Sequence, residues 1–160
     1  MSINKGKIFE KKFRADWLQS MPDSSIDRLY DSVSGYRAIS NVSDFICYKY
    51  PHIFYLECKS HSGNTFPFTA LTQYDALSAK VGITGVRAGM VLYMYDHDVV
   101  LYVPISTVTK MKADGLKSVN VKMLGTESYA NYVIYEIPSK KKRVYMDSDY
   151  SILMATKEGE

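Results

Sequence analysis

The most constraining feature of the sequence is a pair of apolar segments on either side of Pro51, both of which carry charged residues at their outer ends. The segments span residues 44–50 and 53–59, and they are rich in the aromatic and branched side chains that favour β-strands. The pattern predicts a β-hairpin with a two-residue turn at Pro51 and His52. Because its strands are apolar on both faces, we expect the hairpin near the centre of a covered sheet.

The predicted turn determines which residues of the hairpin face each other, with Asp44 opposite Lys59 and Ile46 opposite Glu57. Opposed residues share one face and side chains alternate, so Asp44, Glu57 and Lys59 are expected to project together at one end. Half-buried carboxylates that lie close together repel each other unless a cation neutralises them. Oxygen ligands of this kind favour Mg²⁺ or Mn²⁺, and the Lys59 ammonium could orient a water that attacks a phosphodiester.

A purely structural interpretation of these three residues stays open. Lys59 could form an ion pair with either acid, or all three groups could lie at solvated strand ends. A register change of one residue would move Asp44 to the other face. The letters Glu-x-Lys are weak evidence alone, because they occur again at Glu10-Lys11-Lys12.

Other periodic segments predict helices and strands around the hairpin. Phe9, Phe13 and Trp17 recur every four residues and predict a helix over residues 5–21 that packs onto a sheet, and residues 22–43 are polar and irregular. We further predict helices at 69–81 and 104–111, strands at 88–95, 99–103 and 132–137, and a helix or tail at 147–160. Together these predict one α/β domain over residues 1–160, with a central mixed β-sheet flanked by helices.

Composition excludes several classes of protein. The 160 residues are 46% hydrophobic and carry a net charge of +3, which is compatible with a polyanionic partner without requiring one. Two cysteines and three scattered histidines provide neither a disulfide framework nor a zinc site. No segment is apolar enough to span a membrane, so a cytoplasmic protein is expected. The stretch 115–118 lacks phosphate-loop spacing, which argues against a nucleotide cofactor.

The order of several short motifs resembles a known nuclease family. Asp44, an apolar strand and Glu57-Cys58-Lys59 resemble the Asp…(Glu)-x-Lys signature of the restriction-endonuclease-like PD-(D/E)xK nuclease superfamily. Within it, the chain resembles the RecU-type Holliday-junction resolvases over residues 5–122. The supporting segments are residues 6–10, their opening helix; 66–68, their apolar segment with proline; 69–77 with Gln73, their next helix; and 115–119, their Gly-x-Lys-Ser-Ile stretch.

This resemblance implies a restriction-endonuclease-like core and specific roles. Asp44, Glu57 and the Cys58 carbonyl would bind Mg²⁺, for which Mn²⁺ could substitute, Lys59 would assist the water, and Glu10 and Gln73 would support the site. Residues 22–43 would form a shortened stalk-like segment, as in a phage-borne relative acting in the bacterial cytoplasm. The implied substrate is branched DNA, a four-way junction nicked on two strands in recombination and repair. That substrate has two-fold symmetry, so a homodimer is expected.

Basic residues provide candidate contacts to DNA phosphates. They are Lys7, Lys11 and Arg14 on the first helix, Arg28 and Arg37 in the polar segment, Lys117, and the run Lys140, Lys141, Lys142 and Arg143. The alternative for the run is a solvated turn before a strand, and for Glu10 a solvated helix acid beside several lysines.

Other functions remain open from the sequence. One is a nuclease of the same fold that acts on other branched or duplex DNA. Another is a catalytically silent DNA-binding protein that assists recombination, in which the acids and Lys59 form ion pairs only. A protein-interaction domain without a nucleic-acid role is a third.

Overall fold

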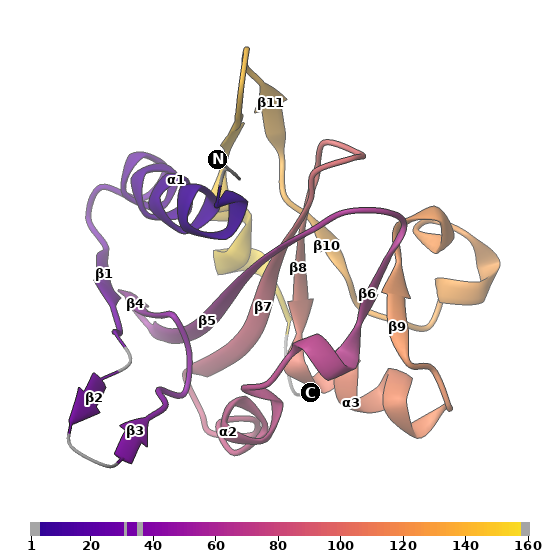
Figure 1. Ribbon diagram of the computed structural model, residues 1–160, viewed down its shortest axis with the longest axis horizontal. Coiled ribbons are helices and arrows are strands. Elements are labelled where there is room, and N and C mark those ends of the chain that lie inside the picture. The colour runs from indigo at the N-terminus through magenta and orange to yellow at the C-terminus, as the bar shows by residue number, and fades with distance from the viewer. Residues whose placement is uncertain (1–3, 31, 35–36, 158–160) are drawn as a thin grey trace.

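A central six-stranded mixed sheet organises the protein (Figure 1). The computed structural model describes residues 4–30, 32–34 and 37–157, with backbone only for 32–34 and 37–39. Strands β5 and β7 run parallel, and the other neighbours are antiparallel. The spatial order is β1 (Ser25–Arg28), β4 (Phe45–Lys49), β5 (His52–His61), β7 (Val86–Met94), β8 (Val99–Pro104) and β10 (Tyr135–Glu136).

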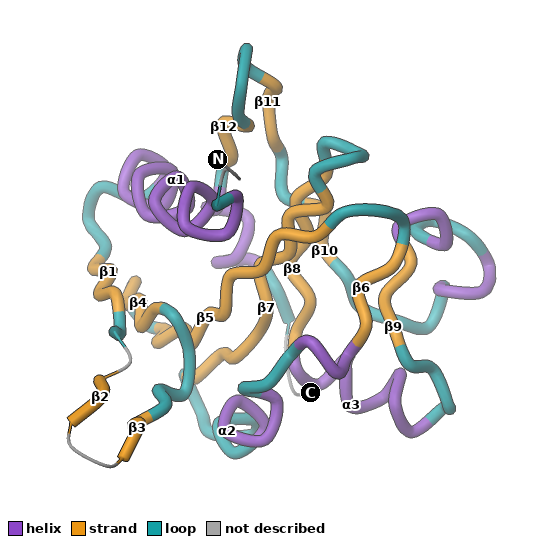
Figure 2. The backbone as a smooth tube through the Cα atoms, in the orientation of Figure 1, coloured by secondary structure: helices purple, strands orange, loops and turns teal. Residues whose placement is uncertain are grey.

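Helices cover both faces of this sheet, which confirms the predicted α/β class. Helix α1 (Lys5–Ser20) and the 3-10 helix η4 (Tyr150–Ala155) pack on one face, where Phe13 and Trp17 are fully buried. On the other face lie the 3-10 helix η1 (Phe68–Ala70), α2 (Tyr74–Ser78) and α3 (Ile105–Ala113). Figure 2 shows α1 above the strands and α2 and α3 below them. Within the described ranges, no helix has the length and apolar character needed to cross a membrane.

Among the described residues, three small two-stranded sheets accompany the main sheet. One pairs β2 (Ser32–Ser34) with β3 (Arg37–Ile39), the second pairs β6 (Thr65–Pro67) with β9 (Ser118–Asn120), and the third pairs β11 (Ser139–Lys141) with β12 (Met146–Ser148). The 3-10 helices η2 (Val121–Met123) and η3 (Glu127–Tyr129) follow β9.

The prediction that residues 22–43 are irregular was wrong. Strand β1 forms an edge of the main sheet, with Ile26 buried opposite Cys47 of β4. A single buried apolar side chain in a polar strand is too weak a pattern to reveal that strand from sequence. The β2–β3 hairpin occupies the rest of the segment where a stalk was expected, and residues 31, 35 and 36 lie outside the described part of the chain.

The helix predicted over residues 69–81 is interrupted. Leu71 ends η1 with φ −92° and ψ 77°, which is not helical, and α2 then has five residues. Leu71 and Leu77 are nonetheless buried in the same core cluster. The apolar spacing therefore indicated correctly that Leu71 and Leu77 are buried together, although two short helices rather than one long helix carry them. The predicted strand over 132–137 is reduced to β10.

The C-terminal stretch 147–160 was expected to be a helix or a tail. Asp147 and Ser148 instead belong to β12, and the 3-10 helix η4 follows them. Residues 158–160 lie outside the described part of the chain.

The predicted hairpin is present as β4 and β5, but its register differs by two residues. Phe45 lies opposite Leu56 and Lys49 opposite His52, which places the turn at Tyr50 and Pro51. Because side chains alternate with a period of two, an even shift keeps every residue on its predicted face. Continued by one residue, the observed register sets Asp44 opposite Glu57 rather than Lys59.

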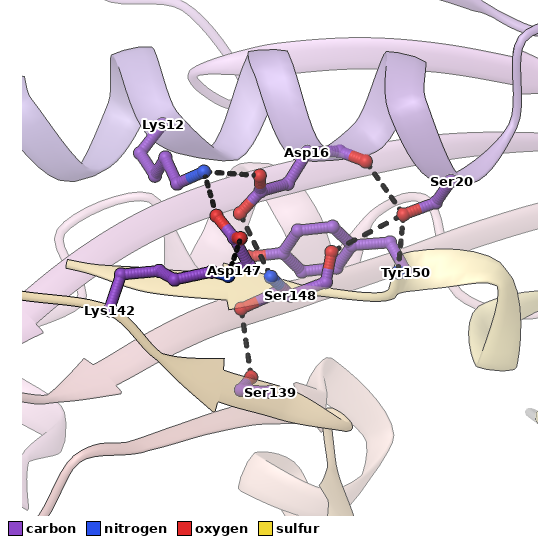
Figure 3. A network of polar contacts seen from close by, with 8 residues as sticks. All are labelled: Lys12, Asp16, Ser20, Ser139, Lys142, Asp147, Ser148 and Tyr150. Carbon is purple, nitrogen blue, oxygen red and sulfur yellow. Dashed lines mark hydrogen bonds and ion pairs between the residues drawn. The ribbon is translucent and has the colours of Figure 1, made fainter.

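A buried acid that the sequence did not single out joins α1 to the C-terminal hairpin (Figure 3). Asp16 is 2% exposed, and its Oδ1 lies 2.7 Å from Lys12 Nζ. Its Oδ2 accepts a hydrogen bond from the Ser148 N–H at 3.0 Å. Lys12 Nζ also lies 2.6 Å from Asp147 Oδ1. These contacts connect segments more than 100 residues apart, so they orient α1 relative to the sheet.

We expect Asp16→Ala to lower the free energy of unfolding by about 2 kcal/mol, since it leaves the buried Ser148 N–H without its acceptor and removes a partner of Lys12. Urea unfolding measures the change. Asp23→Ala is the matched control, because Asp23 is exposed and its ion pair with Lys49 should contribute little. Equal losses in the two variants would contradict the role assigned to Asp16.

Candidate active site

The predicted residues Asp44, Glu57 and Lys59 meet where β5 extends past the start of β4. The ladder between the two strands ends at Phe45 and Leu56, which leaves the Cys58 N–H without a main-chain partner from β4. Asp44 Oδ2 accepts that N–H at 2.9 Å. A strand residue directs its N–H and C=O to the same side, so the Cys58 carbonyl faces the same edge as Asp44.

Glu57 is the most buried acid of the group, with 2% of its side chain exposed. Its Oε1 lies 3.2 Å from Lys59 Nζ, whereas Oε2 is buried without a hydrogen-bond partner. Burial and the neighbouring charge of Asp44 raise the pKa of Glu57 to about 7. An unpaired buried carboxylate oxygen is costly, and such groups concentrate at functional sites.

Glu10 of α1 joins this cluster through Arg28, the last residue of β1. Arg28 Nη2 lies 2.9 Å from Glu10 Oε2, and Nη1 lies 3.3 Å from Asp44 Oδ1. Nη1 also donates to the main-chain oxygen of Asp44 at 3.0 Å. Burial and the charge of Asp44 raise the pKa of Glu10. Glu10 is therefore half-buried and paired with Arg28 rather than fully solvated beside the lysines, and Arg28, predicted as a phosphate contact, lies among the acids.

Gln73, the remaining predicted site residue, lies apart from this cluster in its contacts. It occupies the N-cap position of α2 without a side-chain capping bond, and its side-chain oxygen accepts a hydrogen bond from Thr72 Oγ1 at 2.9 Å. In the described part of the chain, no hydrogen bond joins it to Glu57 or Lys59.

The predicted DNA-contacting residues lie mainly on exposed surface. Lys7, Lys11 and Arg14 are exposed on α1, and Lys117 is exposed between α3 and β9. The side chain of Arg37, in β3, lies outside what the structure describes.

The basic run Lys140 to Arg143 forms most of a strand and turn in the β11–β12 hairpin, which rises beside α1 (Figure 1). Lys141 pairs with Asp98 at 2.6 Å, and Lys142 lies 3.6 Å from Asp147. All four side chains of the run are exposed. The hairpin therefore presents cations to solvent while Asp98 and Asp147 partly balance them.

The oxygens of Asp44, Glu57 and the Cys58 carbonyl are the hard donors that Mg²⁺ and Mn²⁺ prefer. Such an ion would give the buried Glu57 Oε2 the partner that it lacks, so these residues fit a divalent cation. Among the described residues, no three His, Cys, Asp or Glu side chains are gathered as a ready metal site. Arg28 and Lys59 hold the acids instead. Burial raises the pKa of the Cys58 thiol well above its usual value, so the sulfur is not a nucleophile.

The sequence has no significant match to a protein-family model or to a curated protein. Among solved structures, the fold is similar to that of Hjc, a Holliday junction resolvase from the archaeal hyperthermophile Archaeoglobus fulgidus. The TM-score is 0.50 at 13% sequence identity, and the match covers 64% of this chain and 78% of the Hjc chain. This likeness shows the restriction-endonuclease-like fold that the motifs implied.

Proposed function

We propose that the protein is a Mg²⁺-dependent endonuclease that resolves four-way DNA junctions by paired nicks during recombination and repair. The observation that carries the proposal is the meeting of Asp44, Glu57 and Lys59 at one strand end, with Glu57 Oε2 buried and unpartnered. The fold around them is similar to that of Hjc, a Holliday junction resolvase. The RecU-type motifs, in the same order along the chain, support the same substrate.

In this proposal Asp44, Glu57 and the Cys58 carbonyl hold Mg²⁺, and Mn²⁺ can substitute. The bound ion would stabilise negative charge on the phosphoryl group that is attacked. Lys59, whose side chain is 25% exposed, is close enough to solvent to orient the attacking water while Glu57 positions its ammonium. Glu10 supports the site through Arg28. Gln73 is assigned its supporting role by the resemblance.

The proposed substrate also defines the assembly. A four-way junction is two-fold symmetric and needs two nicks, so we propose a homodimer with one site per subunit. Each chain would act as one nuclease domain in the bacterial cytoplasm, with the β2–β3 hairpin in the place of a longer stalk. The exposed basic residues of α1 and of the β11–β12 hairpin would contact phosphates.

The test compares cleavage of a synthetic four-way junction with cleavage of linear duplex of the same sequence, with and without Mg²⁺. The wild type is expected to nick the junction on two opposed strands only when Mg²⁺ is present. Glu57→Gln is expected to lose this activity, because it removes a carboxylate ligand. Glu127→Gln is the matched control, since Glu127 is an exposed acid in η3 and should not matter.

Each other outcome selects a different function. Equal cleavage of linear duplex would keep the nuclease and discard the resolvase. Tight junction binding without cleavage in Mg²⁺ or Mn²⁺ would instead favour a DNA-binding protein that assists recombination.

A further inference from the structure

Arg28 occupies a position between two acids from different parts of the chain. Its guanidinium contacts Glu10 of α1 through Nη2 and Asp44, at the start of β4, through Nη1. The guanidinium carbon also lies 5.4 Å from the centre of the Phe45 ring and 5.2 Å from that of Tyr30. Ion pairs and aromatic faces thus hold a planar cation in one orientation.

The contact with Asp44 engages the carboxylate oxygen that a cation would need. Asp44 Oδ2 accepts the Cys58 N–H, which leaves Oδ1 as the oxygen without a main-chain donor. Arg28 Nη1 lies 3.3 Å from that oxygen. An arginine keeps its charge at any working pH, so the guanidinium beside Oδ1 competes with a divalent cation for that oxygen and repels it.

The charges of the cluster lead to the same conclusion. When all the groups are ionised, three carboxylates (Glu10, Asp44 and Glu57) meet two cationic side chains (Arg28 and Lys59). A divalent cation added beside Arg28 would leave an excess positive charge, whereas one that replaces Arg28 would leave the cluster neutral. A phosphate is the matching new partner for the displaced guanidinium, because its oxygens fit the planar fork of donors.

We propose that Arg28 is a countercharge that competes with the divalent cation for Asp44 Oδ1, and that a DNA phosphate draws it away. Cation binding and DNA binding are then coupled, each strengthening the other by the same factor. This inference rests on the proposed function for its DNA partner. Arg28 acts here as a positioning residue, which delays cation loading until the substrate is present.

The first test measures Mn²⁺ binding to the free protein, by the electron paramagnetic resonance signal of unbound Mn²⁺, without DNA. Arg28→Gln is expected to bind Mn²⁺ about 10-fold more tightly than the wild type, because the competing cation is gone. Lys122→Gln removes one positive charge from an exposed site in η2 and is expected to change nothing. Arg28→Lys, which keeps the charge but not the fork, is expected to fall between.

The second test measures the coupling itself, by fluorescence anisotropy of a labelled four-way junction in EDTA and in Ca²⁺. We expect Ca²⁺ to tighten junction binding by the wild type about 10-fold, and by Arg28→Gln clearly less. Circular dichroism of each variant establishes that it is folded, and Arg28→Lys serves if Arg28→Gln is not.

Equal or weaker Mn²⁺ binding by Arg28→Gln, or none by either protein, would overturn the countercharge role. An equal effect of Ca²⁺ on the two proteins would overturn the coupling. The Mn²⁺ titration contains no DNA, so it can succeed while the junction is not cut. That result would keep the countercharge and discard the proposed function.

Discussion

Without divalent cations, Glu57→Gln is expected to be more stable than the wild type at pH 8 by about 3 kcal/mol, and this advantage should fade toward pH 4.5. Burial, with the nearby charge of Asp44, raises the pKa of Glu57 from 4.5 to about 7. The folded protein therefore binds a proton here more tightly than the unfolded chain does. Between these two pH values, the wild type's free energy of unfolding falls as pH rises.

Urea unfolding of both proteins in EDTA at pH 4.5, 6 and 8 measures this difference. Glu127→Gln, at an exposed position, is expected to show no pH-dependent gain. If Glu57→Gln and the wild type differ in stability by the same amount at all three pH values, the ionised Glu57 carboxylate does not destabilise the folded protein.

The variant would thus be more stable and inactive, as happens where a protein keeps an unfavourable group for function. Mg²⁺ should remove part of the strain, since an ion that binds the folded state stabilises it. We therefore expect Mg²⁺ at pH 8 to raise the melting temperature of the wild type more than that of Glu57→Gln.

Lys59→Met is expected to lower the rate of junction cleavage by about 10²- to 10⁴-fold while junction affinity stays close to that of the wild type. Methionine keeps the length of the apolar stem and removes the ammonium, which lies 3.2 Å from Glu57 Oε1. Without that ammonium, the attacking water loses the group proposed to orient it. Single-turnover cleavage in saturating Mg²⁺, with affinity measured in Ca²⁺, separates the two effects.

Lys122→Met is the matched control and is expected to cleave at the wild-type rate. Wild-type cleavage by Lys59→Met would reduce Lys59 to a structural partner of Glu57. A loss of affinity as large as the loss of rate would make Lys59 a phosphate contact instead.

The sequence alone was sufficient for the elements with strong local patterns. Helix α1, with its aromatic residues every four positions, and the two apolar strands around Pro51 form as predicted. Asp44 and Glu57 lie on the predicted face of the hairpin although the predicted turn position was wrong, because a register shift of two residues leaves every side chain on its face. The convergence of those acids with Lys59 was therefore determined by the sequence.

Tertiary structure decided what depends on the docking of distant segments. Arg28 reads as one more basic residue in a polar stretch, and the packing of β1 and α1 against β4 turns it into the partner of Glu10 and Asp44. In the sequence Asp16 is an ordinary acid in a predicted helix, and only its contact with Ser148 of β12 in the folded structure shows that it is buried. Local periodicity reports which face of an element is buried, whereas an ion pair depends on where two elements come to lie relative to each other. The sequence thus determined the acids and Lys59 of the site, and only the packed structure determined which cations balance them.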